Sequence, residues 1–445
     1  HWLVPHFEGH PDNYGTKPPL LIWLQAISMK VLGVNELAVR LPSALAGLAT
    51  VLLLWLFAFQ VLKKPLVGYF SGLILLTSQL YIDKHGAITG DYDALLTLFQ
   101  TIYLIAFYLY LTKQKVRYLY LTGLGVLLAG WTKGIAGLFF LPGLLAYIFL
   151  DKKVGFIFRS RQVYLTGLTT LLGILSYYII RESLYPGYLE TVWGNELGGR
   201  FFEAREGYQR SFWFYLGFLF RNEGFYPWLF LLPLGFFIGL SDNQIRRFSQ
   251  LVLINSILFF LIISTSKTKF EWYILPLLPI WSVLVAIGLE NLYSGAVSKL
   301  NLAGWKKQAF LLLFLIAFFA FPYWKVIKKV YVFEHQGYEV EKVLYADFMK
   351  RNEAVKAYTI LHPGYNGHIV FYKKLYNLEG YSIRQKILQK PRPQVQVIDN
   401  DHELTAGEWV MVCESAADQY LLANYHVETV SDWKKCRMYK INGEK

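Results

Sequence analysis

Long stretches without a charged residue are the feature that most constrains how this chain of 445 residues folds. A transmembrane helix needs about 17–25 mostly apolar residues, and length together with the absence of charge separates a span from a buried helix. The sequence therefore predicts an α-helical polytopic membrane protein. About ten spans are expected, at residues 41–62, 65–82, 94–112, 118–132, 134–150, 162–180, 224–241, 248–266, 272–289 and 308–324.

The composition agrees with a chain whose main solvent is lipid. Hydrophobic residues make up 55% of the chain and charged residues 17%, and the mean hydropathy is +0.33. Soluble domains average about 25% charged residues, so a disordered, collagen-like or ordinary cytosolic protein is excluded. The net charge of +13 would suggest nucleic acid for a soluble protein, but in a membrane protein it favours cytoplasmic loops rich in Lys and Arg. No nucleic-acid partner is predicted.

The connections between the predicted spans alternate in charge. The positive-inside rule places the basic set in the cytoplasm and the mixed or acidic set outside. The tail 325–445 then lies outside as well, and we expect a multi-pass protein of a bacterial inner membrane. His1 falls on the external side, from which we expect a preceding helix that is missing from this sequence. The basic set consists of Lys63, Lys64, Lys113, Lys115, Arg117, Lys152, Lys153, Arg159, Arg161, Arg246, Arg247, Lys299, Lys306 and Lys307.

Three regions follow from this topology. Residues 1–40 form the first external loop, in which residues 20–32 have a length suited to an interfacial helix. Residues 41–324 form the transmembrane domain. Residues 325–445 form a small extracytoplasmic α/β domain, with predicted helices near 340–351 and 415–424. Its predicted strands are 357–361, 368–372, 394–398, 409–413 and 436–441.

The chain has two cysteines, which is too few for a disulfide-dense scaffold. Cys413 and Cys436 both lie on predicted strands of the tail. Outside the cytoplasm a disulfide can form, and two buried thiols are the alternative.

Ionisable residues gather in the external loops, whereas the interiors of the predicted spans carry none. Ion-coupled transporters usually place such groups at bilayer depth, so this pattern favours chemistry at the outer interface on a lipid-linked substrate. Asp91 and Asp93 stand immediately ahead of a span, where carboxylates cost solvation energy unless they are used or paired. Either is a candidate general base. The alternative is that they cap the following helix and favour its dipole.

Several cations are also predicted to face the outside. Lys17 precedes two prolines at the start of the interfacial helix, where it can meet a lipid phosphate or simply snorkel. Lys133 occupies a minimal external turn, and Lys267 and Lys269 occupy a tight turn between two spans. External lysines run against the positive-inside rule, and several of them around one cavity suit a phosphate or diphosphate.

Together these features resemble a known superfamily, and five groups of motifs carry the resemblance. They are WLVP, KPPL, GVNE and RLPSA within residues 2–44, GDYDALLTLF at 90–99, TKG with LPG at 132–143, NE with GRF at 195–201, and SKTK with WYILP at 266–276. In this order they resemble the aminoarabinose transferase and protein mannosyltransferase superfamily, membrane glycosyltransferases of the GT-C fold that use polyprenyl-phosphate sugars. The resemblance covers about residues 1–290, and the tail is similar only in type.

The resemblance implies a mechanism and residue roles. The phosphate of the lipid-linked sugar is held by cations, here Lys17 and Arg200, with Lys267 or Lys269 as further candidates. A carboxylate deprotonates the acceptor, which attacks the anomeric carbon with inversion. Asp93 matches the second acidic position of the family, with Asp91 beside it. The foremost acid of the family lies upstream of WLVP and is therefore expected to precede this sequence.

Two departures from the aminoarabinose branch concern a metal site. That branch typically has Glu before Lys-Pro-Pro, where this chain has Thr16, and a His shortly before Gly-Arg-Phe, where residues 191–210 contain none. We therefore predict no metal and no other cofactor, and the sugar is left open. A further candidate metal site matches no tight motif in its spacing; its residues are His1, His6, Glu8, His10 and Asp12.

The leading interpretation is a glycosyltransferase that moves a sugar from a polyprenyl phosphate to a lipid or protein acceptor outside the cytoplasm. A transporter or flippase of a lipid-linked glycan is one alternative, although it predicts a polar path through the spans. A non-catalytic relative, with the tail as a binding module, is the other.

Overall fold

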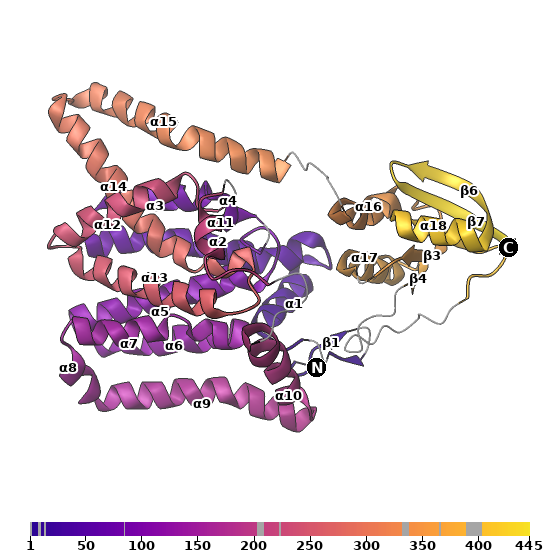
Figure 1. Cartoon of the computed structure of the whole chain (residues 1–445), viewed down its shortest axis with the longest axis horizontal. Helices are drawn as coiled ribbons and strands as arrows, with labels where there is room; N and C mark the ends of the chain where they lie inside the picture. The colour runs from indigo at the N-terminus through magenta and orange to yellow at the C-terminus, as the bar shows by residue number, and fades with distance from the viewer. Residues whose placement is uncertain are drawn as a thin grey trace. The chain divides into compact units, whose positions relative to one another are not determined.

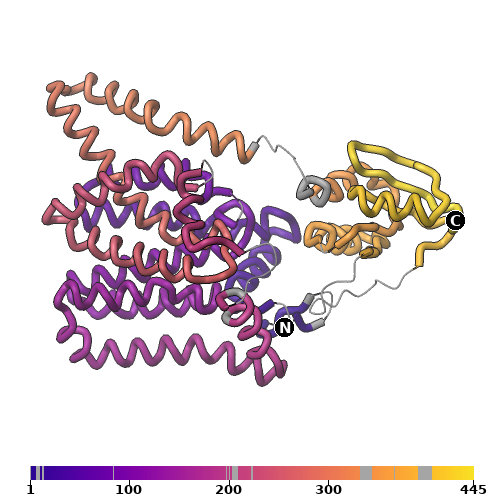
Figure 2. Tube along the Cα trace, in the orientation of Figure 1, coloured from indigo at the N-terminus to yellow at the C-terminus, as the bar shows by residue number. Residues whose placement is uncertain are grey.

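The structure is a computed structural model that describes residues 2–7, 10–12, 15–83, 85–202, 209–221, 224–331, 338–364, 366–388 and 403–445. The chain forms two compact units (Figures 1 and 2). The helical unit comprises His1–Pro5 and Gly15–Val332. The C-terminal unit comprises His6–Tyr14 and Phe333–Lys445.

Seven helices of the described chain are long and apolar enough to cross a membrane. Each coincides with a predicted span, so the prediction of a multi-pass membrane protein is confirmed. They are α2 with η1 (Glu36–Leu62), α5 (Tyr92–Lys113), α6 with η2 (Val116–Leu138), α9 (Arg161–Leu184), α13 (Arg246–Thr265), α14 (Leu277–Lys299) and α15 (Gly304–Tyr331).

The other three predicted spans correspond to shorter apolar helices, so the expected number of ten spans stays a prediction. They are α3 (Pro65–Leu76), α7 (Leu141–Leu150), and η4 with α12 (Trp228–Ser241). At about 1.5 Å per residue, a helix of this size falls short of a hydrocarbon core of about 30 Å. A charge-free stretch includes turns as well as helix, which is why the prediction was too long. Residues 134–138, for example, form η2 and continue α6.

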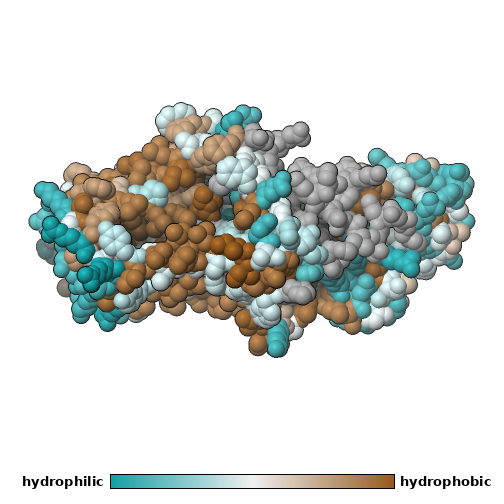
Figure 3. All heavy atoms as spheres, turned by 90° about the horizontal axis from the view of Figure 1, so that it is seen from below, coloured by the Kyte–Doolittle hydropathy of each residue, from teal (hydrophilic) through white to brown (hydrophobic). Residues whose placement is uncertain are grey.

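Two helices lie at the centre of the helical unit and two at its edge. The apolar windows of α5 and α14 are 83% and 78% buried, whereas those of α9 and α15 are 11% and 22% buried. α5 packs against α6 and α2, and α14 packs against α3 and α12. Figure 3 shows apolar side chains over much of the outer face of this unit. The central position of α5 carries its first residues into the interior.

Short elements connect these helices. The predicted interfacial helix is present as α1, and its place in the interface stays a prediction. The apolar residues 211–220, too short for a span, contain α11. The short elements are α1 (Leu20–Leu32), α4 (Gln79–Ile82), α8 (Val154–Phe158), α10 (Tyr188–Val192), η3 (Trp193–Phe202), α11 (Phe214–Leu219) and η5 (Glu271–Ile274).

The C-terminal unit is a mixed α/β domain, which confirms its predicted class. A five-stranded sheet has the order β4-β3-β5-β7-β6, with β3 parallel to β4 and β5 and the remaining pairs antiparallel. A separate hairpin pairs β1 (His6–Phe7) with β2 (His10–Pro11). The sheet strands are β3 (Ala357–His362), β4 (Ser382–Ile387), β5 (Trp409–Val412), β6 (Tyr425–Trp433) and β7 (Cys436–Glu444), and the helices are α16 (Tyr338–Arg351), α17 (Gly367–Leu378) and α18 (Ser415–Asn424).

Three of the predicted strands and both predicted helices of this unit are confirmed, and the strand at 368–372 is wrong. Asn366 caps α17 there by accepting bonds from the backbone N–H groups of His368 and Ile369 at 3.0 and 3.4 Å. Burial at Ile369, Tyr372 and Tyr376 follows helical spacing, which a five-residue window reads as alternation. Strands β4 and β6 were not predicted, and 394–398 lies outside the described residues.

Cys413 and Cys436 form a disulfide bond, which resolves the two alternatives left by the sequence. Cys413 follows β5 directly and Cys436 begins β7, and these two strands are neighbours in the sheet. Both sulfur-bearing side chains are buried.

Candidate functional site

The start of α5 is fixed by contacts from two other helices. Asp91 is its N-cap and accepts a bond from the backbone N–H of Tyr92 at 2.6 Å. Ser43 of α2 donates to the Asp91 carbonyl at 2.8 Å, and Gln25 of α1 donates to the Gly90 carbonyl at 2.8 Å. Gly90 has a φ of +67°, which favours glycine. The predicted capping role of Asp91 is thus present, and the second acid is left for another purpose.

Asp93 forms a buried ion pair with Lys133. The Lys133 ammonium donates to both carboxylate oxygens of Asp93, at 2.6 and 2.7 Å. The Asp93 and Lys133 side chains are only 2% and 8% exposed. The ammonium also lies 5.4 Å from the centre of the Tyr273 ring. Since a buried charge is costly unless paired, each of these two groups makes the other tolerable there.

His85 precedes Asp91 and Asp93 in the sequence, where it was assigned no role, and the structure places it in this site. Its ring contacts the Asp91 carboxylate as an ion pair and stacks on Trp272 at 3.6 Å between ring centres. Its φ of +63° is unusual for a residue with a side chain. Burial opposes ionisation of Asp91, but the hydrogen bond and charge of His85, with the charge of Lys133, hold the pKa of the Asp91 carboxyl below its usual range.

The segment ahead of α1 brings Lys17 to the same place. The Lys17 ammonium lies 5.4 Å from the centre of the Tyr92 ring. Tyr92 stands between Asp91 and Asp93 in the sequence. The preceding Thr16 is held twice, because its hydroxyl donates to Glu196 at 2.6 Å and its carbonyl accepts from the Tyr188 hydroxyl at 2.8 Å. The structure therefore brings Asp91, Asp93, Lys133 and Lys17 together around the first turn of α5.

The turn at residues 266–269, called the basic turn below, uses its two lysines differently. The ammonium of Lys269 donates to the carbonyls of Ser266 and, at 3.2 Å, Arg210. Burial lowers the pKa of this ammonium. Lys267 is exposed, and its backbone N–H donates to the Phe201 carbonyl at 3.2 Å. These contacts place the basic turn beside η3.

Arg200 lies in η3, and its side chain is outside the described part of the structure. Residues 203–208, which follow η3, are also outside it. The phosphate-binding roles of Arg200, Lys267 and Lys269 stay predictions.

One group of three in the described part of the chain has the ligand types of a metal site. Atoms of His85, Asp91 and Asp93 lie within 4.8 Å of one another. Both oxygens of Asp93 are already bound by Lys133, and Asp91 is bound by His85. A divalent ion would have to displace the Lys133 ammonium, so this arrangement does not favour one, and the metal requirement stays untested.

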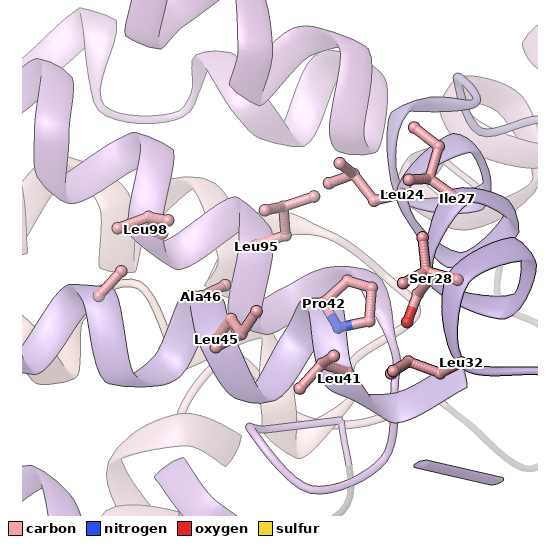
Figure 4. A pocket seen from close by; sticks show the side chains of 12 residues that line it. Leu24, Ile27, Ser28, Leu32, Leu41, Pro42, Leu45, Ala46, Leu95 and Leu98 are labelled. Carbon is pink, nitrogen blue, oxygen red and sulfur yellow. The ribbon is translucent and has the colours of Figure 1, made fainter. Parts of the chain in front are cut away.

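An apolar groove of about 500 Å³ opens near the start of α5 (Figure 4). It lies between α1, α2 and α5, and Leu95 in its wall follows Asp93 by two residues. The side chains in Figure 4 face one another across a hydrocarbon-lined space that suits an apolar chain. The lining residues are Leu24, Ile27, Ser28, Val31, Leu32, Leu41, Pro42, Leu45, Ala46, Ala49, Leu95 and Leu98.

Comparisons of the sequence with known proteins point to one group. Residues 16–180 match the family described as dolichyl-phosphate-mannose-protein mannosyltransferase. The undecaprenyl phosphate-alpha-4-amino-4-deoxy-L-arabinose arabinosyl transferase of Aeromonas salmonicida is 29% identical over 319 residues, covering 69% of this chain and 56% of that protein. An uncharacterized protein of Aquifex aeolicus is 32% identical over 149 residues, covering 34% of this chain and 29% of its own length. The chain thus matches 56% of the length of the Aeromonas protein and 29% of the length of the Aquifex protein.

Comparisons of the structure agree on the fold. ArnT from Cupriavidus metallidurans in the apo state has a TM-score of 0.70 at 15% identity, over 99% of this chain and 90% of that one. The same protein bound to undecaprenyl phosphate has a TM-score of 0.69. The oligosaccharyltransferase of Archaeoglobus fulgidus has a TM-score of 0.50 at 13% identity, over 83% of this chain and 56% of that one. The predicted GT-C fold class is confirmed.

Proposed function

We propose that this chain, a member of the aminoarabinose transferase and protein mannosyltransferase superfamily of GT-C proteins, moves a sugar from a polyprenyl phosphate to an acceptor. The transfer takes place at the outer face of a bacterial inner membrane, where the C-terminal unit also lies. The acceptor is a lipid, such as a lipid A-like molecule, or a protein. The curated Aeromonas salmonicida relative is named for such a donor.

One observation carries the proposal: the first two turns of α5 contribute both to a buried carboxylate–lysine pair and to the wall of an apolar groove. Asp93 and Lys133 are in contact at 2.6 Å, and Leu95, on the same helix, lines the groove. A polyprenyl phosphate has one anionic group at the end of a long hydrocarbon chain. Charge at one end and a hydrocarbon-lined groove beside it match both parts of that molecule.

The donor is bound through its two parts. Its first isoprene units occupy the groove between α1, α2 and α5. Its phosphate meets Lys17 and Lys133, with Arg200, Lys267 and Lys269 as further ligands from η3 and the basic turn. The phosphate then competes with Asp93 for the Lys133 ammonium, and donor binding frees that carboxylate to act as a base.

The reaction is a displacement at the anomeric carbon of the sugar. Asp93 takes the proton from the acceptor hydroxyl or amine, with Asp91 as the second candidate base. The acceptor atom attacks from the side opposite the phosphate, which gives inversion. The bond from the anomeric carbon to the phosphate oxygen breaks, its electron pair stays on that oxygen, and the cations stabilise the charge that develops. Polyprenyl phosphate leaves as the second product.

A transfer assay tests this proposal. The protein, expressed from its complete gene, is given radiolabelled polyprenyl-phosphate sugars and native membranes, and label is followed into the lipid and protein fractions. Label in lipid supports a lipid acceptor, and label in protein supports a protein acceptor. If folded protein transfers no label from any polyprenyl-phosphate donor, the proposal is contradicted.

The role of Lys17 is tested in the same assay. Lys17→Ala is expected to raise the KM for the donor by about tenfold, because one charge-assisted bond to the phosphate is lost. Lys30→Ala, which changes an exposed lysine at the other end of α1, is the matched control. An unchanged KM for Lys17→Ala would leave the lysine with a snorkelling role.

A further inference from the structure

Arg181 is buried on a helix that is mostly exposed. It lies in the last turn of α9, and its side chain is 1% exposed. The apolar window of α9 is only 11% buried, the lowest value among the seven candidate spans of the described chain. Burying a guanidinium group is costly, so a site that keeps one there calls for a specific set of contacts.

Two tyrosines contact the Arg181 side chain. Its guanidinium donates to the Tyr177 hydroxyl at 2.9 Å and lies 4.3 Å from the centre of the Tyr188 ring. The Tyr188 ring also stacks on the Tyr178 ring, with 6.0 Å between the ring centres. A buried cation that lies against the face of an aromatic ring favours one orientation of that ring.

The orientation of Tyr188 matters because its hydroxyl reaches the segment before α1. It donates to the carbonyl of Thr16 at 2.8 Å, across 172 positions of sequence. Thr16 is 4% exposed and is the residue immediately before Lys17. The main chain that carries Lys17 is therefore attached to α9 and α10 through one tyrosine hydroxyl.

The same tyrosines adjoin the other lysine of the site. A Cβ atom added to Gly134 would lie 2.6 Å from the Tyr178 hydroxyl. Gly134 follows Lys133 directly and has a φ of +57°. The tyrosine cluster thus touches the backbone next to both Lys17 and Lys133.

We propose that Arg181 is a positioning residue that acts through Tyr188 on Thr16, and so fixes Lys17 where it meets the donor phosphate. This inference rests on the proposed function for the identity of the ligand. Arg181 contacts Tyr188, which in turn bonds Thr16, so we expect the two residues to affect donor binding more than proton transfer.

Kinetic constants test this role. Tyr188→Phe removes only the hydroxyl that holds Thr16, and Arg181→Met removes the cation from the ring. Both variants are expected to raise the KM for the donor about three- to tenfold, as for one lost hydrogen bond, with little change in kcat. Arg181→Lys, which keeps a cation near Tyr188, is expected to restore part of the affinity. Tyr164→Phe is the matched control, since its hydroxyl bonds the Phe158 carbonyl at the other end of α9.

A spin label at position 17 tests the positioning without any activity. The two cysteines of the chain are joined in a disulfide, so Lys17→Cys introduces a single reactive thiol. The mobility of this label is expected to rise when Tyr188→Phe or Arg181→Met is added, and to stay the same with Tyr164→Phe.

The outcomes separate this inference from the proposed function. Unchanged label mobility in Tyr188→Phe overturns the inference, whether or not the protein transfers sugar. A fall in kcat with an unchanged KM also overturns it. Increased mobility in a protein that transfers no sugar supports the link from Tyr188 to Lys17 and contradicts the proposed function alone. If Arg181→Met does not fold, Tyr188→Phe carries the test.

Discussion

The two lysine-bearing turns of the candidate site differ in what holds their ammonium groups. Lys133 pairs with Asp93, a charged side chain 40 positions earlier in the sequence. Lys269 bonds the neutral carbonyls of Ser266, in its own turn, and Arg210. The pairing of Lys133 cancels a charge, whereas the bonds of Lys269 fix the shape of a turn.

The difference shows why cations of similar appearance in the sequence have different roles. A phosphate that reaches Lys133 must compete with a carboxylate, and its arrival changes the state of that carboxylate. A phosphate that reaches Lys269 meets an ammonium already oriented by backbone carbonyls, and no proton acceptor is released. We therefore expect substitutions at the Asp93–Lys133 pair to change catalysis, and substitutions in the basic turn to change mainly stability and donor affinity.

The largest effect is expected for Asp93→Asn. This substitution keeps the size of the side chain and removes the base, so kcat is expected to fall by about 10²-fold or more. The measurement is transfer of label from a polyprenyl-phosphate sugar by equal amounts of folded protein, judged by size-exclusion chromatography in detergent.

Asp242→Asn is a suitable control, because Asp242 lies at the far end of the helical unit from α5's first turn and pairs with Lys64 at 3.9 Å. Normal activity of Asp93→Asn would remove Asp93 from the mechanism. It would also reduce the Asp93–Lys133 pair to a structural contact, like the bonds of Lys269.

Lys133→Met is expected to cost more stability than any other single substitution at the site. It leaves the Asp93 carboxylate buried without its partner, which costs about 3–5 kcal/mol. Thermal unfolding of the purified protein measures this loss. The double variant Asp93→Asn with Lys133→Met removes both charges and is expected to recover much of the stability while staying inactive. If the double variant is as unstable as Lys133→Met, the loss is one of packing and not of charge.

The sequence predicted the helices well because charge-free length is a local property of the chain. It predicted less well where individual elements begin and end, as at η2, which continues α6 instead of beginning a new helix. In the tail, five residues of α17 resembled a strand because a short apolar run fits both the helical and the strand periodicity. The strand β6 was missed because most of its residues are exposed and carry no clear alternation.

The candidate site was predictable in its residue types and not in its pairings. Asp91, Asp93 and Lys133 attract attention because charged groups beside a span need a reason. That Lys133 pairs with Asp93 depends on the packing of α5 against α6, which no local pattern encodes. His85 reaches Asp91 through a backbone conformation with positive φ, and Arg181 is buried by tyrosines of α9 and α10. Both contacts exist only once the tertiary structure is formed.

Lys269→Met tests the other half of the comparison, the lysine of the basic turn. It removes two bonds to backbone carbonyls and relieves the cost of burying a charge, so the net loss of stability is expected to be about 1 kcal/mol. Thermal unfolding again measures it, with Lys267→Met as the control, because Lys267 is exposed and is expected to leave stability unchanged. Equal effects of the two substitutions would show that the bonds of Lys269 do not stabilise the turn.

The smallest effect is expected for Asp91→Asn, which tests the second carboxylate of the candidate site. An amide still caps α5, so only the interaction of the charge with His85, Lys133 and the helix dipole is lost, about 0.5–1 kcal/mol. Because the folded-state pKa of Asp91 is lowered, its charge stabilises the protein above the unfolded pKa of about 3.9. That contribution is lost as the pH falls toward the folded value. The difference in melting temperature between the unaltered protein and Asp91→Asn should therefore shrink as the pH falls below about 4. A difference that instead grows on acidification would mean that protonated Asp91 is the stabilising form, and would make Asp91 rather than Asp93 the better candidate for the base.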